Sequence, residues 1–250
     1  MMKRFLLRST LLSTLLGVIT TVAGGASPQT RGLPAIPGLS TRGEPLSWTI
    51  LILLTVMTLL PAIILAMTPF VRILIVFHFL RQALGTQSTP TNQTLIGLAL
   101  LLTYFIMAPV GAAIEQNAIV PLEHGRVSSW QAVERASGPL KSFMLKYSRE
   151  KDLALFVELA KVPSPNAPDD LPMRVVAPAY LISELQTGFQ IGAVLFLPFL
   201  VIDIAVASVT TSVGMFQLPP VVISTPLKIL LFVGVDGWHL IVGSLMKSFT

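Results

Sequence analysis

The chain has 250 residues, of which 53% are hydrophobic and only 12% are charged, and its mean hydropathy is +0.76. Ordinary soluble domains carry about 25% charged residues, so this composition excludes a compact soluble fold, a disordered chain and a collagen-like fibre. The chain also contains no cysteine, which excludes a disulfide-stapled secreted module. A membrane protein is the class that fits.

The net charge of +5 does not indicate nucleic-acid binding. Three of the 17 basic residues, Lys3, Arg4 and Arg8, lie at the N-terminus, in a stretch that we expect to be removed. The remaining chain contains no basic run interleaved with aromatic residues. We therefore expect no nucleic-acid partner.

Residues 1–26 are typical of a secretory signal peptide. The basic start leads into an apolar stretch over residues 11–22, and Gly24 and Ala26 occupy the −3 and −1 positions of a cleavage site after Ala26. The alternative is an uncleaved first membrane helix. Residues 27–45 are rich in Pro, Gly, Ser and Thr, which predicts a flexible tether.

Four later stretches are apolar and long enough to cross a bilayer, which takes about 20 residues. We expect them to form two apolar helical hairpins, over residues 46–114 and 185–250, with prolines that interrupt or kink the helices. The four stretches are residues 46–67, 93–114, 185–212 and 218–246, and the internal prolines are Pro61, Pro109 and Pro198.

A shorter apolar helix is predicted over residues 70–84, between the first two stretches. It begins after Thr68-Pro69 and stops at Gly85. It is too short to cross a bilayer and carries Arg72 and Arg81, so we expect it to pack against protein or to lie at the interface.

Residues 115–184 hold most of the charged side chains and predict a small helical subdomain outside the lipid. Apolar residues recur at helical spacing over residues 130–160, where Pro139 is well placed to start a helix, and residues 163–172 form a proline-rich loop. With a translocated N-terminus, residues 69–92 face the cytoplasm, and their two arginines and no acid agree with the positive-inside rule. The subdomain then faces the periplasm.

No catalytic or nucleotide-binding pattern occurs in the chain. Its three histidines, His78, His124 and His239, are far apart and have no acidic companion at metal-ligand spacing. We expect neither an enzyme nor a bound metal or cofactor.

Three ionisable residues lie inside apolar stretches: Asp203, Lys228 and Asp236. Each costs about 2.5 to 3.5 kcal/mol at the centre of a membrane helix, so each should face protein or water. They could form a proton or solute pathway, or buried ion pairs between helices or subunits. Lys228 and Asp236 could instead reach an interface.

The segment 208–220 joins the last two apolar stretches without a single charge. A polar loop is usual in such a place, but this one contains Met215, Phe216 and Leu218. It is either a hairpin turn buried by its neighbours or a soft apolar constriction that closes a pore, because methionine adapts its shape readily.

Two long runs resemble signatures of the FliP family: PAYLISELQTGFQIG at residues 178–192 and PLKILLFVGVDGW at residues 226–238. Shorter matches are FVRI at residues 70–73, LGT at 84–86 and FIMAP at 105–109. The similarity extends over residues 46–249.

The resemblance implies a subunit of the flagellar type III protein export gate in the bacterial inner membrane and basal body, with a sister branch in virulence injectisomes. It implies a homo-oligomeric ring, a pentamer, that passes unfolded flagellar proteins. FliQ-like and FliR-like subunits complete the gate, beside FlhB-like and FlhA-like components. Helices in the assembled gate are kinked hairpins that stand largely above the lipid plane. The signal peptide favours the flagellar branch.

The residue patterns, taken with the resemblance, indicate roles for particular residues. Met215, Phe216 and Leu218 would close the pore, although relatives have more methionine at this turn. Residues expected to make helix or subunit contacts are Glu184, Asp203, Lys228 and Asp236.

Two other hypotheses remain open at the level of sequence. A small-solute or proton-coupled carrier would use Asp203 and Asp236, but no inverted repeat supports it. A receptor-like scaffold would bind its partner through residues 115–184, and that subdomain would fold alone.

Overall fold

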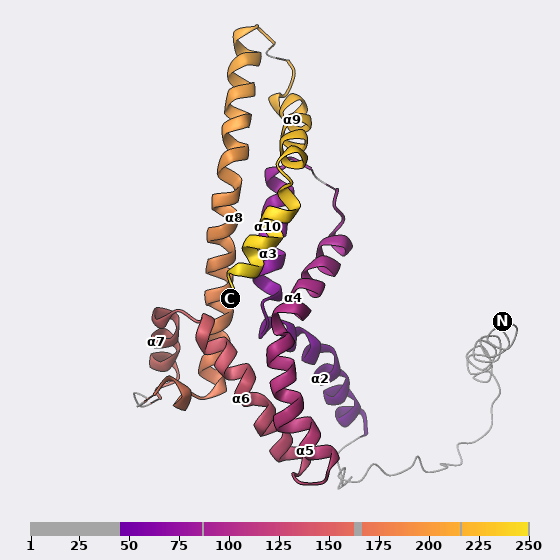
Figure 1. Cartoon of the computed structure of the whole chain (residues 1–250), viewed down its shortest axis with the longest axis vertical. Coiled ribbons are helices and arrows are strands. Elements are labelled where there is room, and N and C mark those ends of the chain that lie inside the picture. Colours follow the sequence, from indigo (N-terminus) through magenta and orange to yellow (C-terminus); the bar gives the residue numbers. More distant parts are fainter. Residues whose placement is uncertain (1–45, 87, 163–166, 216, 250) are drawn as a thin grey trace, which may run out of the picture. The chain divides into compact units, whose positions relative to one another are not determined.

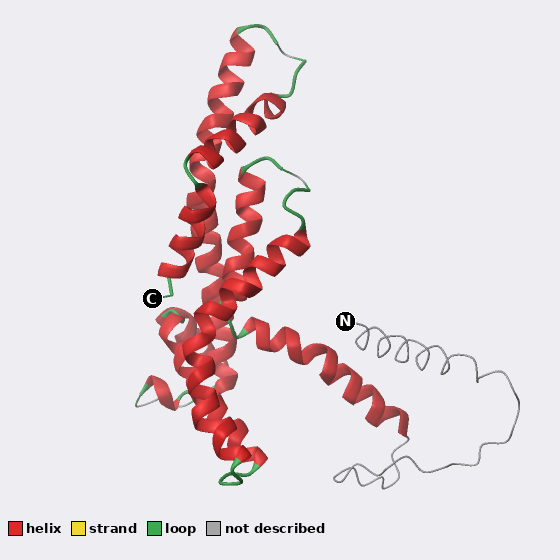
Figure 2. Ribbon diagram, turned by 45° about the vertical axis from the view of Figure 1, so that its right-hand side comes forward, coloured by secondary structure: helices red, strands yellow, loops and turns green. Residues whose placement is uncertain are grey.

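The structure, a computed structural model, describes residues 46–86, 88–162, 167–215 and 217–249, and all regular elements in these ranges are helices (Figure 2). The predicted all-α fold is confirmed. The chain divides into two compact units, Met1–Ile52 and Leu53–Thr250, and only the first turns of helix α2 are described in the former. The predicted signal peptide, its cleavage site at Ala26 and the tether lie outside the described residues.

Helix α2 (Leu46–Ala66) is uncharged, and its stretch Trp48–Ala66 is long and apolar enough to cross a membrane. Its apolar side chains are exposed almost throughout, as a helix in contact with lipid requires. Pro61 lies inside the helix and does not end it.

Helix α3 (Phe70–Ala83) confirms the short apolar helix expected between the first two stretches. Gly85 follows it with a φ of +75°, a conformation that favours glycine. A Cβ at this position would lie 2.7 Å from the Thr225 hydroxyl oxygen, so the end of α3 packs closely against the segment around Thr225.

Helix α4 (Asn92–Ile114) continues through a π-helical turn, η1 (Glu115–Ile119), into α5 (Val120–Glu123). The combined stretch Asn92–Glu123 is a candidate span of 32 residues. The hydroxyl of Thr91 caps its start by accepting the Thr94 backbone N–H at 3.3 Å.

Helices α6 (Ser129–Tyr147) and α7 (Glu150–Leu159) and the short 3-10 turn η2 (Pro168–Asp170) follow. Ser128 and Gln131 form a reciprocal capping box at the start of α6. Pro139 lies inside α6, so the expectation that it starts a helix is wrong: the capping box supplies a stronger start ten residues earlier in the chain.

Helix α8 (Met173–Ser212) has 40 residues, passes through Pro178 and Pro198, and begins well before the apolar stretch predicted from residue 185. It therefore crosses the boundary that we expected between the subdomain and the second hairpin.

Helices α9 (Pro220–Gly234) and α10 (Gly237–Lys247) replace the single predicted stretch 218–246 and meet at a bend of 66°. Helix α9 runs back along α8 (Figure 1). By length and composition the described residues contain three candidate membrane spans, or up to four if this bent pair counts as one.

Helix α3 packs against both α4 and α8. Gly188 and Gly192 lie one turn apart on α8 at the contact with α3. A Cβ at Gly192 would come within 2.5 Å of the Phe79 ring, so the absence of a side chain there lets the two helices approach closely. This approach positions the polar residues of both helices.

Candidate functional site: two ion pairs and an apolar turn

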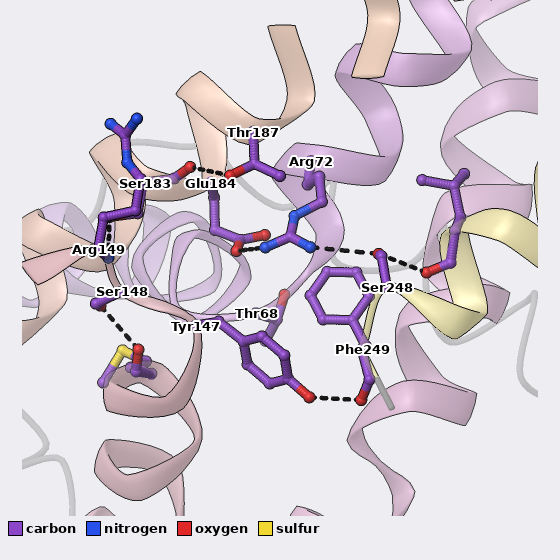
Figure 3. Close-up of polar contacts among 12 residues, drawn as sticks. Thr68, Arg72, Tyr147, Ser148, Arg149, Ser183, Glu184, Thr187, Ser248 and Phe249 are labelled. Atoms are coloured by element: carbon purple, nitrogen blue, oxygen red, sulfur yellow. Dashed lines mark hydrogen bonds and ion pairs between the residues drawn. The ribbon is translucent and has the colours of Figure 1, made fainter. Parts of the chain in front are cut away.

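The first ion pair joins Arg72 of α3 to Glu184 of α8 (Figure 3). The two side chains are 4% and 0% exposed, so both charges are removed from water. Removing one partner of such a pair costs about 3 to 5 kcal/mol, because the other charge is left buried and uncompensated. The pair therefore makes the packing of α3 on α8 strongly specific.

Aromatic side chains and the end of α10 surround this pair. Arg72 Nη1 donates to the Ser248 hydroxyl at 3.3 Å, and the guanidinium carbon lies 4.0 Å from the ring centroid of Phe249. Three buried polar atoms have no hydrogen-bond partner among the described residues: Arg72 Nε, Glu184 Oε2 and the Tyr180 hydroxyl.

Ser183, next to Glu184 in the chain, makes hydrogen bonds to the start of α7. Its hydroxyl donates to Asp152 Oδ2 at 2.6 Å and accepts the Arg149 backbone N–H at 3.0 Å. The Arg149 guanidinium in turn pairs with Asp152 at 2.8 Å. Two consecutive residues of α8 thus fix the start of α7 and the start of α3.

The second ion pair joins Lys228 of α9 to Asp203 of α8, with 2.5 Å between Nζ and Oδ2. The Ser224 hydroxyl donates to the other Asp203 oxygen at 2.6 Å, and Lys228 also donates to the Ala83 carbonyl at 3.0 Å. That carbonyl belongs to the last turn of α3, where a cation is favourable. Lys228 is only 3% exposed, whereas Asp203 is 29% exposed.

Asp236 takes part in none of the three ion pairs found among the described residues, and it is exposed. It stands at the bend between α9 and α10 with a φ of +52°. The structure thus brings Asp203 and Lys228 together, joins Glu184 to Arg72, and leaves Asp236 apart.

Sequence reasoning missed Arg72 as the partner of Glu184, because it expected α3 to pack against protein or lie at the interface without naming what Arg72 would contact. It also missed Ser224, whose hydroxyl donates a hydrogen bond to the second carboxylate oxygen of Asp203. The FVRI match at residues 70–73 contains Arg72 and was the available signal.

The apolar turn lies between α8 and α9. Gly214, with a φ of +81°, ends α8, and the Met215 backbone N–H donates back to the Thr210 carbonyl at 3.0 Å. Met215 and Leu218 are both exposed, and Phe216 lies outside the described residues. The turn therefore presents apolar side chains that this chain does not bury.

His78 and Arg81 anchor the segment between α3 and α4. Arg81 Nη1 donates to Asn92 Oδ1 at 2.6 Å, and its Nη2 lies 3.1 Å from His78 Nδ1. Partial burial, and then the nearby Arg81 charge, lower the pKa of His78 from its ordinary value. In the part of the chain that the structure describes, no cluster of three or more His, Asp or Glu side chains could hold a metal ion.

Comparison with known proteins identifies the relatives of this chain. The model of the FliP family matches residues 53–245. The chain is 54% identical over 200 residues to the flagellar biosynthetic protein FliP of Bacillus subtilis, covering 80% of this chain and 90% of the relative. It is 49% identical over 221 residues to FliP of Pectobacterium carotovorum, covering 86% of each, and 43% identical over 202 residues to FliP of Aquifex aeolicus, covering 80% and 84%. The resemblance inferred from the two sequence runs is confirmed.

Proposed function

This chain belongs to the FliP family, and we propose that it is a pore-forming subunit of the flagellar protein export gate in the bacterial inner membrane. In this proposal several copies form a ring, unfolded flagellar proteins pass through its centre, and the subdomain around α6 and α7 faces the periplasm. The family membership and the apolar helices support the setting. The main support for the pore-forming role is the apolar turn between α8 and α9.

An idle export gate must hold back ions and yet admit many different unfolded chains. A ring of apolar, deformable side chains can do both, because it excludes hydrated ions without a fixed specificity pocket. Met215 and Leu218 are 40% and 45% exposed in a turn with no charge. We assign them, with Phe216, to the constriction.

The ion pair of Lys228 and Asp203 braces the hairpin that carries this turn. It links α9 to α8, and the bond from Lys228 to the Ala83 carbonyl links both helices to α3. Because α8 and α9 are joined in this way, the turn between them can keep its position while its side chains change conformation. This brace is a helix contact within one chain.

Exposed apolar residues on α8 supply a surface for neighbouring subunits. Val194, Leu197, Val201 and Ile204 recur at spacings of three or four residues, so they share one face of the helix. We propose that a second copy of this chain, in a pentamer, or a FliQ-like or FliR-like subunit covers this face. FlhB-like and FlhA-like components would join the assembled gate.

The first test is the native mass of the detergent-extracted protein, produced alone and then together with FliQ-like and FliR-like proteins. We expect a discrete ring that gains mass on co-production. A monomer or dimer that is unchanged by these neighbours would contradict the proposal.

A second test addresses the constriction alone. Combined Met215→Ala and Leu218→Ala substitutions should raise ion leakage through assembled gates in vesicles without lowering the native mass. Leu230→Ala in α9 is the matched control, since it also shortens an exposed apolar residue of the same hairpin but lies outside the proposed subunit face of α8. Equal leakage from the double variant and the control would remove Met215 and Leu218 from the pore.

The geometry gives the carrier hypothesis less support. Both oxygens of Asp203 already accept hydrogen bonds, from Lys228 and Ser224, and Asp236 stands apart at the bend. A carrier would show saturable transport of a small molecule by a monomer or dimer, which the mass measurement separates from a ring.

A further inference from the structure

The last residues of the described chain, Ser248 and Phe249, contact two elements far from α10 in sequence (Figure 3). The ring of Phe249 lies over the Arg72 guanidinium of α3, and Ser248 accepts a hydrogen bond from the same group. The Tyr147 hydroxyl of α6 donates to the Phe249 carbonyl at 2.5 Å. These two residues therefore connect α10 to α3 and to the subdomain at once.

The contacts are directional rather than merely apolar. A guanidinium over an aromatic ring is held by the charge distribution of the ring, and the attraction is stronger away from water. The rings of Tyr147 and Phe249 also meet edge to face with centroids 5.2 Å apart. Displacing Phe249 would break all of these contacts together and open the buried Arg72–Glu184 pair to water.

The other end of α10 has the features of a hinge. Asp236 adopts the left-handed conformation, which costs a non-glycine residue free energy. Gly237 follows, and a Cβ there would come within 2.2 Å of the Phe232 ring. Trp238 packs edge to face on both Phe77 and Phe232 beside this break. Helix α10 thus begins at a strained, closely packed bend.

Between its two ends, α10 borders an open apolar groove of about 610 Å³. Residues of α8, including Val194 and Pro198, line one side, and Leu240 and Ser244 of α10 line the other. In this lining Leu245 is buried in the core shared with α3 and Ile241 packs against that core, whereas Leu240 and Ser244 are exposed. Much of the face of α10 toward α8 is therefore not closely packed.

We propose that Ser248–Phe249 is a latch that holds α10 closed, and that α10 opens by turning about Val235–Asp236 when the latch is released. Opening withdraws Leu245, widens the groove beside α8 and uncovers the Arg72–Glu184 pair. Because Tyr147 belongs to α6, the latch also makes the position of α10 depend on the subdomain. This inference concerns the fold of the single chain and does not depend on the export function.

Backbone amide exchange of the full chain in detergent tests the latch. Tyr147→Phe removes one hydroxyl and keeps every ring, so it should raise exchange across residues 238–249 about three- to tenfold. Phe249→Ala removes the ring and should raise exchange in the same segment about tenfold or more. In both variants exchange in α3 and in residues 175–192 of α8 should rise much less than in residues 238–249.

Two substitutions elsewhere provide matched controls. Tyr104→Phe removes a hydroxyl and Phe105→Ala a ring from α4, where both side chains are largely exposed. Neither should change exchange in α10. The latch is overturned if the Tyr147 and Phe249 variants match these controls, or if they raise exchange equally in α3, α8 and α10, because a uniform rise means global destabilisation.

Discussion

The two halves of helix α8 differ in what covers them. Residues 173–192 contain eight buried positions, whereas residues 193–212 contain only two. The first-half set is Val175, Val176, Ala179, Tyr180, Ser183, Glu184, Gly188 and Gly192, and the second-half set is Phe199 and Thr210. The first half is completed by α3, α6 and α7 of the same chain. The second half leaves a long apolar face that something outside the chain must cover.

The polar contacts follow the same division. In the first half Glu184 and Ser183 are fully buried and hold separate elements. In the second half a single pair, Asp203 and Lys228, joins two neighbouring helices, and its acid is partly exposed. Substitutions in the first half should therefore change the stability of the isolated chain, and substitutions in the second half should mainly change its assembly.

The largest effect on stability is expected from Glu184→Gln. The amide keeps the shape but leaves the Arg72 charge buried and unpaired, which should cost about 3 to 5 kcal/mol. Thermal unfolding of the purified chain measures this loss. Glu158→Gln, at an exposed site on α7, is the control and should change little. A small loss at Glu184 would show that the first half does not depend on its ion pair.

Lys228→Glu should lower the yield of the oligomer, because the hairpin that carries the apolar turn loses its ion pair. Two acids then face each other across α8 and α9, and the bond to the Ala83 carbonyl is lost. Adding Asp203→Lys to this variant should restore assembly. The measurement is the native mass after co-production with FliQ-like and FliR-like proteins. Normal assembly of the Lys228→Glu variant would show that assembly does not depend on this ion pair.

Gly192→Ala tests the close approach of α3 and α8. The new methyl group would meet the Phe79 ring, and such overpacking costs about 1 to 3 kcal/mol. Gly111→Ala in α4 is the matched control, because a Cβ there meets nothing within 4 Å and alanine favours a helix. Thermal unfolding should separate the two, with a lower midpoint for the first variant only.

The smallest effect concerns pH. The pKa of His78 is lowered in the folded chain, so the unfolded chain binds a proton more readily. His78 therefore adds nothing to the pH dependence of stability well above pH 6.5, and stability falls as the pH drops below that value. The unfolding midpoint should decrease more between pH 7.5 and 5.5 in the unchanged chain than in His78→Gln. Equal decreases of the midpoint in the two chains would show that folding does not lower the pKa of His78.

Much of the fold followed from the sequence because apolar length and end signals are local. The short helix α3 and the uncharged helices α2 and α4 were predicted within a few residues. The start of α8 was missed, since Arg174 and Glu184 gave residues 173–184 the composition of the charged subdomain. The bend at Asp236 was missed because a residue with positive φ has no distinct local pattern.

The site followed only in part. Asp203 and Lys228 were singled out because charge inside an apolar helix requires a partner, but their pairing with each other was one alternative among several. Arg72 and Glu184 lie 112 residues apart, and only the packing of α3 on α8 brings them together. Ser183 and Ser224 gave no signal, since isolated serines occur in many apolar helices.

The separation of Arg72 from Glu184 also has a consequence for biogenesis. Ribosomes add about 5 to 20 residues per second, so the arginine is incorporated roughly 6 to 22 seconds before its carboxylate exists. During this interval α3 has neither its counter-charge nor the two glycines of α8 against which it packs. The nascent helix must keep its guanidinium hydrated or bound to another anion, and α3 can complete its packing only after residues 184–192 of α8 have been made.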